Sequence, residues 1–239
     1  MIEVIEVRKY YGSSATGLEK ESLTINKGEI VGIIGENGSG KTTLLKAIMG
    51  LCELNEGKVL IEGKPVEEMY GKMAYITCEG SYFPSMKPLE YGEFLLNTVP
   101  GFDMERYIKL LKYFELDVKQ KIKNLSHGQK AKLEISAGFC KRAEYILMDE
   151  PFIGKDMFTR RDFLKLMISY LKDNETILIA THLVDEIENF VDRVVILRYG
   201  RIKADLLMDD IKENNRDLKS VLMEITGYRE DKYRHLFTM

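Results

Sequence analysis

The stretch from Ile30 to Thr43, IVGIIGENGSGKTT, limits the fold of this chain more than any other segment. Gly35 is followed by four residues and then by Gly40, Lys41 and Thr42, which is the pattern of a phosphate-binding P-loop. An apolar run precedes the loop, and an amphipathic segment follows it. The pattern therefore predicts a buried strand that leads through the loop into a helix.

A loop of this kind binds phosphate mainly through its backbone. Its glycines let the N–H groups surround a β-phosphate, the lysine bridges the β- and γ-phosphates, and the following hydroxyl binds Mg²⁺. Lys41 and Thr42 take these last two roles here. The residues predicted to contact the nucleotide in this segment are Asn37, Gly38, Ser39, Gly40, Lys41, Thr42 and Thr43.

The rest of the pattern predicts an α/β fold. The runs YILMD (145–149), TILIAT (176–181) and RVVILR (193–198) are short and solidly apolar, which is typical of parallel strands buried on both faces. Helical segments (159–174 and 183–191) separate them, and strand–helix alternation indicates an α/β chain. Strands are also expected at 2–7, 21–25, 30–35, 58–61 and 73–77, in part as antiparallel sheet.

Two further segments show helical spacing of apolar residues. LEYGEFLLNTV and MERYIKLLKYFEL predict an inserted helical subdomain at about 79–140. The charged segment 206–239 is expected to form a helical tail. The chain as a whole is interpreted as a single domain.

The stretch LSHGQ, 125–129, begins the last helix of that subdomain. Ser126 and Gln129 have the spacing of a helix N-cap with its capping box. Lys130 and Lys132 follow in the first turns, where positive charge opposes the helix dipole. Either the lysines point into solvent, or this helix start meets an anion.

Three side chains are expected at the carboxyl edge of the sheet, where open α/β folds bind their ligands. Asp149 and Glu150 end the run YILMDE, and His182 follows TILIAT. Asp149 suits the coordination shell of Mg²⁺, and Glu150 suits the base that polarises an attacking water. His182 is expected to contact a γ-phosphate.

Composition excludes several classes of protein. No apolar run reaches the ~18 residues needed to cross a bilayer, and the N-terminus lacks a signal peptide, so the chain is expected in the cytosol. Cys52, Cys78 and Cys140 fit neither a disulfide framework nor a zinc site. A formal net charge of −3 argues against nucleic acid as a partner.

With these residues assembled, the chain resembles the ATP-binding cassette family, the nucleotide-binding subunits of ABC transporters. GENGSGKT is similar to the Walker A motif of that family, LSHGQ to its signature motif and YILMDE to its Walker B motif. Tyr11 matches the aromatic residue that stacks on adenine, with Tyr10 as the second candidate. The resemblance implies that Glu150 and His182 are catalytic, and that Ser126, Gly128 and Gln129 contact ATP.

The resemblance also implies a fold, a cofactor and partners. The fold is a P-loop NTPase (RecA-like) core with an antiparallel β-subdomain and an inserted α-helical subdomain. Two cassettes, identical or paralogous, bind ATP and Mg²⁺ head to tail, so that the signature of one meets the γ-phosphate held by the other. Integral membrane subunits complete a transporter at the inner face of the membrane.

The cargo is open at this stage. A bacterial exporter of peptides or drugs is the favoured interpretation, by analogy. A non-transport ATPase of the same family, such as an assembly or repair factor, is the alternative.

Three positions depart from the family pattern. His127 replaces the first glycine of the signature pair, and Lys155 replaces a leucine in the segment GKD (154–156) that matches the D-loop. A glutamine is expected after KMAYIT, where this chain has Cys78 and Glu79. Either Glu79 substitutes for that glutamine or neither side chain reaches the metal. Both readings predict slow basal hydrolysis with nucleotide binding retained.

Overall fold

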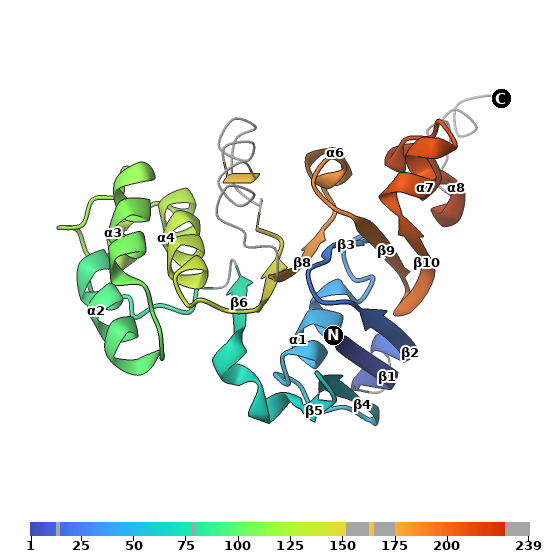
Figure 1. The fold of residues 1–239 in the computed structure, drawn as a ribbon, viewed down its shortest axis with the longest axis horizontal. Helices are drawn as coiled ribbons and strands as arrows, with labels where there is room; N and C mark the ends of the chain where they lie inside the picture. The colour runs from blue at the N-terminus through green and yellow to red at the C-terminus, as the bar shows by residue number, and fades with distance from the viewer. Residues whose placement is uncertain (13–14, 78–79, 152–162, 165–174, 228–239) are drawn as a thin grey trace.

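The computed structural model describes residues 1–12, 15–77, 80–151, 163–164 and 175–227. A six-stranded sheet forms its centre (Figure 1). In sheet order, its strands are β10 (Arg201–Leu207), β9 (Arg193–Arg198), β3 (Ile30–Ile34), β8 (Thr176–Thr181), β7 (Tyr145–Asp149) and β6 (Met73–Thr77). The strands β9, β3, β8, β7 and β6 run parallel, and β10 pairs antiparallel with β9. Every residue of β7 and β8 is buried, which confirms the interpretation of their apolar runs.

A second sheet is antiparallel and lies near the N-terminus. Its order is β2 (Ala15–Ile25), β1 (Ile2–Tyr11), β4 (Glu56–Ile61) and β5 (Lys64–Pro65). The sequence predicted β1 and β2 several residues too short. Both strands contain register shifts, and Glu6 and Lys20 have positive φ. Bulges of this kind insert a residue and break the two-residue alternation from which a strand is recognised.

Helix α1 (Lys41–Ile48) packs between the two sheets. Its Leu44, Leu45 and Ile48 are fully buried against side chains from both. The helix ends at Ile48 with Met49 as its C-cap, and Gly50 then adopts a left-handed conformation, as expected for the glycine predicted to end this helix. Because α1 follows β3 directly, this packing fixes the P-loop at the carboxyl end of the sheet.

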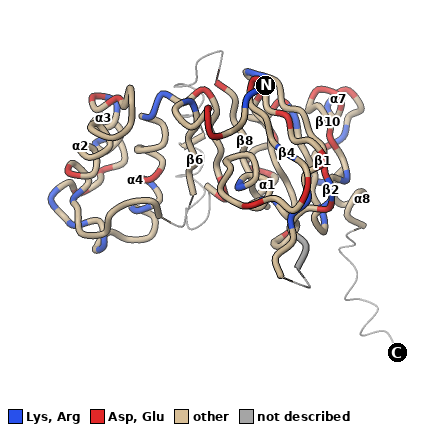
Figure 2. Tube along the Cα trace, turned by 90° about the horizontal axis from the view of Figure 1, so that it is seen from below, with Lys and Arg blue, Asp and Glu red and all other residues tan. Residues whose placement is uncertain are grey.

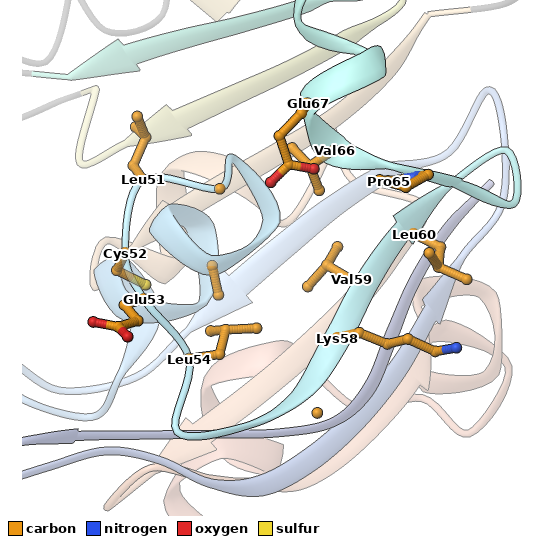
Figure 3. A pocket seen from close by; sticks show the side chains of 13 residues that line it. Leu51, Cys52, Glu53, Leu54, Lys58, Val59, Leu60, Pro65, Val66 and Glu67 are labelled. Carbon is orange, nitrogen blue, oxygen red and sulfur yellow. The ribbon is translucent and has the colours of Figure 1, made fainter.

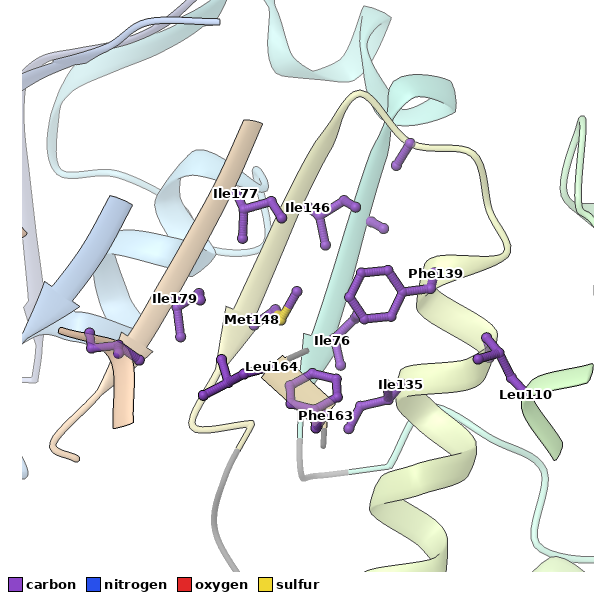
Figure 4. Close-up of a cluster of buried hydrophobic side chains, with 14 of the residues drawn as sticks. Ile76, Leu110, Ile135, Phe139, Ile146, Met148, Phe163, Leu164, Ile177 and Ile179 are labelled. Atoms are coloured by element: carbon purple, nitrogen blue, oxygen red, sulfur yellow. The ribbon is translucent and has the colours of Figure 1, made fainter. Parts of the chain in front are cut away.

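A helical layer lies at the β6 edge of the central sheet, where α4 (His127–Phe139) packs on the face opposite α1. This layer contains α2 (Pro88–Thr98), α3 (Met104–Tyr113) and α4, with short 3₁₀ turns at Val66–Glu68, Tyr70–Lys72 and Ile122–Asn124. Figure 4 shows Ile135 and Phe139 of α4 directed at Ile76, Ile146 and Met148 of the sheet. Buried apolar side chains therefore connect the sheet to the helices that follow β6.

The C-terminal part of the described chain differs from its prediction. The helical tail was expected from about residue 206, but β10 continues to Leu207 before α7 (Met208–Glu213) and α8 (Leu218–Thr226) begin. Residues in β10 alternate between exposed and half-buried, because this edge strand covers only one face. The helix expected at 183–191 is a single short turn, α6 (Val184–Ile187). Most of the helix expected at 159–174, and all of 228–239, lie outside the described residues.

Charge is mixed over the surface of the described chain. Figure 2 shows acidic and basic residues interspersed along both the sheet region and the helical layer. None of the described helices has the length and apolar character required to cross a membrane.

A buried carboxylate connects α4 to the segment after β6. Glu134 is only 4% exposed, and its two oxygens accept hydrogen bonds from the Ser81 backbone N–H at 2.5 Å and the Ser81 hydroxyl at 2.8 Å. The hydroxyl of Tyr91 donates to the Ser81 carbonyl oxygen at 3.4 Å. These contacts hold the helix that begins at Ser126 against the chain that leaves the central sheet.

Glu134→Gln is expected to make stability less dependent on pH. Burial raises the pKa of the Glu134 carboxyl, although the Ser81 hydrogen bonds oppose the shift. An acid with a raised folded-state pKa stabilises the protein below its unfolded pKa, near ~4.3, and loses this contribution as pH rises through the folded pKa. The glutamine stays neutral, and its amide can accept from the Ser81 N–H while its NH₂ group donates to the Ser81 hydroxyl oxygen. Thermal unfolding at several pH values should show the variant gaining on the parent toward neutral pH, by on the order of 1 kcal/mol.

Ser81→Ala is the matched control for this prediction, because it removes one hydrogen bond and leaves the carboxylate ionisable. Its stability should depend on pH at least as strongly as that of the parent, because the lost hydroxyl is one of the groups that oppose the raised pKa of Glu134. An unchanged pH dependence in Glu134→Gln would contradict the assignment.

Candidate active site at the carboxyl end of the sheet

The P-loop has a backbone that only glycine allows at two positions. Gly40 has a φ of 109°, and a Cβ there would collide with the carbonyl oxygen of Gly17. A Cβ at Gly35 would collide with the carbonyl oxygen of Leu197. No side chain caps the start of α1, and the first-turn N–H groups of a helix have no acceptor within it. This cradle suits an anion.

Lys41 begins α1 and lies beneath the loop. Its side chain is 5% exposed, and its ammonium donates to the carbonyl oxygens of Gly35 at 2.8 Å and Glu36 at 3.2 Å. It also lies 3.3 Å from a carboxylate oxygen of Glu150. A buried cation in this position is ready to exchange a carboxylate for a phosphate oxygen.

Asp149 and Thr42 lie together, as the sequence predicted for two metal-binding residues. The Thr42 hydroxyl donates to Asp149 Oδ1 at 3.1 Å. Burial raises the pKa of the Asp149 carboxyl, while the hydrogen bonds from Thr42 and Tyr75 oppose that shift. One hydroxyl and one carboxylate are hard oxygen donors, and Mg²⁺ is usually bound by one or two such groups together with substrate phosphates. The donor set therefore fits Mg²⁺.

Glu150 and His182 meet at the ends of β7 and β8. His182 Nδ1 lies 3.0 and 3.1 Å from the two carboxylate oxygens of Glu150. The Thr181 hydroxyl donates to Glu150 Oε2 at 3.2 Å. Glu150 has a φ of 48°, an uncommon conformation that functional sites often retain. Glu150, the base predicted from sequence, is thus oriented by Thr181 at the end of β8 and by His182, the next residue.

One concavity of about 330 Å³ unites Tyr11 with the P-loop residues that are predicted to contact the nucleotide. Its described lining consists of Tyr11, Gly17, Asn37, Gly38, Ser39, Gly40, Lys41, Thr42, Thr43 and Glu150. Tyr10, the second candidate for the adenine contact, is not among them. The Tyr11 ring is 45% exposed, and the Lys9 ammonium lies 5.2 Å from its centroid. Tyr11 therefore offers a flat face beside the phosphate cradle.

Sequence reasoning missed Gly17, which spaces this ring from the P-loop helix. A Cβ at Gly17 would lie 2.8 Å from Tyr11 Cε2 and 2.8 Å from Thr43 Cγ2. It also missed Tyr75 and Thr181, whose hydroxyls bind the two acidic residues of the site. No local motif marks these three positions, because their partners are distant in sequence.

The signature residues lie elsewhere. Ser126 caps α4, accepting from the Gln129 N–H at 3.2 Å while Gln129 Oε1 accepts from the Ser126 N–H at 2.9 Å, which confirms the capping box. Neither these two residues nor Gly128 is among the described residues lining the nucleotide concavity. Figure 1 shows α4 and α1 on opposite sides of β6. Within one chain, the helix start and the P-loop form separate sites.

The two lysines of that helix are held locally. The Lys130 ammonium donates to the Lys123 carbonyl oxygen at 3.1 Å, and that of Lys132 lies 5.8 Å from the centroid of the Phe114 ring. Neither lysine simply points into solvent. The side chains of Ser126 and His127 are exposed, so the helix start is open to a partner.

Several predicted features fall outside the described residues. These are Cys78 and Glu79, the segment 154–156 with Lys155, and His235. The proposed roles of Cys78 and Glu79 stay predictions. Cys52 and Cys140 are free cysteines in the described part of the chain.

A second concavity of about 660 Å³ lies beyond the end of α1 (Figure 3). Leu51, Cys52 and Leu54 line it from the loop after the helix, opposite Val59 of β4. Burial raises the pKa of the Cys52 thiol. No P-loop residue lines this concavity among the described residues, so it is separate from the candidate active site.

Comparisons with known proteins agree with this geometry. The ABC transporter family model matches residues 18–153. The ATP-binding protein YtrB of Bacillus subtilis is 31% identical over 217 residues, which cover 89% of this chain and 74% of YtrB. The SkfA peptide export ATP-binding protein SkfE of the same organism is 28% identical, and the match covers 93% of this chain and 95% of SkfE. The spermidine/putrescine import protein PotA of Haemophilus influenzae is 31% identical, with 91% and 61% covered.

Solved structures give the same answer. An ATP-binding subunit of an ABC transporter superposes with a TM-score of 0.82 at 28% identity, covering 95% of this chain and 99% of its own. The cassette MJ0796, dimeric in a post-hydrolysis state with ADP and Pi, gives a TM-score of 0.77 at 25% identity, with 87% and 99% covered. The chain therefore belongs to the ABC transporter family, as an ATP-binding ATPase cassette with a P-loop NTPase fold that uses ATP and Mg²⁺.

Proposed function

We propose that this cassette powers a bacterial exporter of peptides or drugs, working head to tail with a second cassette on separately encoded membrane subunits. One observation carries the head-to-tail arrangement. The chain holds a complete phosphate cradle and, away from it, an exposed helix start capped by Ser126. Two copies, or two paralogues, would each supply what the other's site lacks.

The cycle begins from the Lys41–Glu150 ion pair. When ATP enters, the Lys41 ammonium exchanges the Glu150 carboxylate for β- and γ-phosphate oxygens. Glu150 then accepts a proton from the attacking water, while Thr181 and His182 keep it oriented. Thr42 and Asp149 would hold Mg²⁺, which would offset negative charge on the transferred phosphoryl group. Tyr11 stacks on adenine.

The partner chain then closes the site. Ser126, Gly128 and Gln129 of the second cassette meet the γ-phosphate at the start of their helix. Hydrolysis removes the charge that held the two chains together, and the dimer opens. The helical layer, which contains α4 and is tied to the central sheet by the Glu134–Ser81 contact, would pass this motion to the membrane subunits.

One relative supports export: SkfE, named for peptide export, matches this chain over 95% of its own length. We place the cassette at the cytoplasmic face of the membrane, where ATP is available.

Purification of the tagged chain in mild detergent tests the proposal. We expect an integral membrane protein to co-purify, and amphipathic peptides to raise the ATPase rate of the complex in liposomes. Cells that carry the untagged chain serve as the control for the pull-down. Recovery without any membrane protein would favour a non-transport ATPase of the same family. Stimulation by a sugar, a polyamine or a metal ion, and not by peptides, would contradict the proposed cargo.

A further inference from the structure

Tyr75 lies beside the carboxylate that the active site offers to Mg²⁺. It is the central residue of β6, and Asp149 is the last residue of the adjacent parallel strand β7. The strands are in register with Tyr75 opposite Leu147 and Thr77 opposite Asp149. The Tyr75 hydroxyl donates to Asp149 Oδ2 at 3.0 Å. Its ring packs in the apolar cluster between the two sheets, on the side of α1.

Asp149 is consequently held at both oxygens. Thr42 donates to Oδ1 and Tyr75 donates to Oδ2, from two different elements of the fold. The Asp149 residue is 7% exposed, so little solvent is available to take either place. A carboxylate bound at one oxygen can rotate about its χ2 torsion, which is broad for an Asp side chain. A second donor removes that freedom.

We propose that Tyr75 is a positioning residue for the divalent metal, acting through Asp149. This inference rests on the proposed roles of Thr42 and Asp149. The tyrosine hydroxyl fixes the plane of the carboxylate, so that Oδ1 stays beside the Thr42 hydroxyl and both present oxygens to the ion. A supporting group that orients a metal-binding carboxylate typically changes metal affinity when it is removed.

The location of Tyr75 adds to its importance in this chain. It lies three residues before Cys78, where the family pattern has a glutamine that could orient water and metal. Tyr75 is built into a strand, so its hydroxyl does not depend on the segment that follows. The predicted nucleotide contacts of the P-loop and Tyr11 line the nucleotide concavity, and Tyr75 is not among its described lining residues. Its removal should therefore weaken metal binding and leave metal-free nucleotide binding intact.

Tyr75→Phe tests the inference, because it removes one oxygen and keeps the ring. Binding of a fluorescent ATP analogue in EDTA should match the parent within about twofold. The Mg²⁺ concentration that gives half of the metal-dependent gain in binding should rise roughly tenfold. This is the change in affinity expected when one hydrogen bond to a charged group is lost. The Mg²⁺ midpoint of ATPase activity should rise with it. An unchanged Mg²⁺ midpoint overturns the inference, and so does a loss of binding in EDTA.

Tyr145→Phe is the matched control. Tyr145 is the first residue of β7, at the opposite end of this strand from Asp149. Its hydroxyl donates to the carboxylate of Glu62. This variant should keep the parental Mg²⁺ midpoint, and a shift equal to that of Tyr75→Phe would overturn the inference. Asp149→Asn should show almost no metal-dependent gain, and adding Tyr75→Phe to it should change nothing further. A further loss in the double variant would show that Tyr75 acts elsewhere.

The failure of this inference can be told apart from failure of the proposed function. If Asp149→Asn keeps the parental Mg²⁺ dependence, the proposed metal site itself is wrong. If Asp149→Asn loses it and Tyr75→Phe does not, the metal site stands and only the role of Tyr75 falls.

Discussion

Lys41→Ala is expected to abolish detectable ATP binding, because the affinity for ATP should fall by roughly a hundredfold or more. Among the described residues that line the nucleotide concavity, Lys41 is the one basic side chain. The substitution removes the cation that would bridge the β- and γ-phosphates. In the parent, the Lys41 ammonium lies 3.3 Å from the Glu150 carboxylate. Without this ammonium, the negative charge of Glu150 repels an incoming triphosphate. Lost attraction and new repulsion act in the same direction.

Equilibrium titration with a fluorescent ATP analogue measures this effect. Lys46→Ala is the matched control, because Lys46 lies in the last turn of the same helix, away from the P-loop. The control should bind nucleotide like the parent. Parental affinity in Lys41→Ala would refute the assignment of the nucleotide site.

Glu150→Gln is the second substitution with a large expected effect. The glutamine keeps the size of the side chain but cannot accept a proton from water, so hydrolysis should fall by roughly 10²–10⁴-fold. ATP binding should survive, because the P-loop contacts are unchanged. The ATP-bound dimer should then accumulate, and analytical ultracentrifugation with ATP and Mg²⁺ should show it.

Ser126→Arg, added to Glu150→Gln, should abolish that dimer while each chain still binds ATP. Ser126 is exposed and does not line the nucleotide concavity of its own chain. A bulky arginine can therefore interfere with a γ-phosphate only in a partner. Ser85→Arg in the same background should leave the dimer intact. Equal dimerisation of the Ser126→Arg double variant would show that the signature does not act in trans.

Local patterns made much of the fold predictable from sequence. The residues from Gly35 to Thr42 predict the P-loop and its helix, and Ser126 and Gln129 predict the capping box. Both features are formed by residues close together in sequence, so a local motif is enough to predict them. The buried strands β7 and β8 followed from solid apolar runs. Prediction was less accurate where bulges break alternation, as in β1, and at the edge strand β10.

Contacts between distant residues could not be predicted in the same way. Glutamate side chains are mostly exposed in folded proteins. Glu134 is nevertheless buried against Ser81, 53 positions away in sequence. Tyr75 is one aromatic residue among apolar neighbours, and only sheet order brings its hydroxyl to Asp149. Gly17 is marked by no motif, and its importance comes from the ring and helix packed on either side. Such positions depend on tertiary structure.

The most direct test of the head-to-tail account mixes two inactive chains. In the Glu150→Gln background, the Lys41→Ala chain binds no ATP, and the Ser126→Arg chain binds ATP without closing, so each alone should sediment as a monomer. Their heterodimer would combine the intact P-loop of one chain with the intact signature of the other. The account predicts an ATP-dependent dimer in the equimolar mixture, with one nucleotide for two chains. A mixture that stays monomeric at saturating ATP would contradict it.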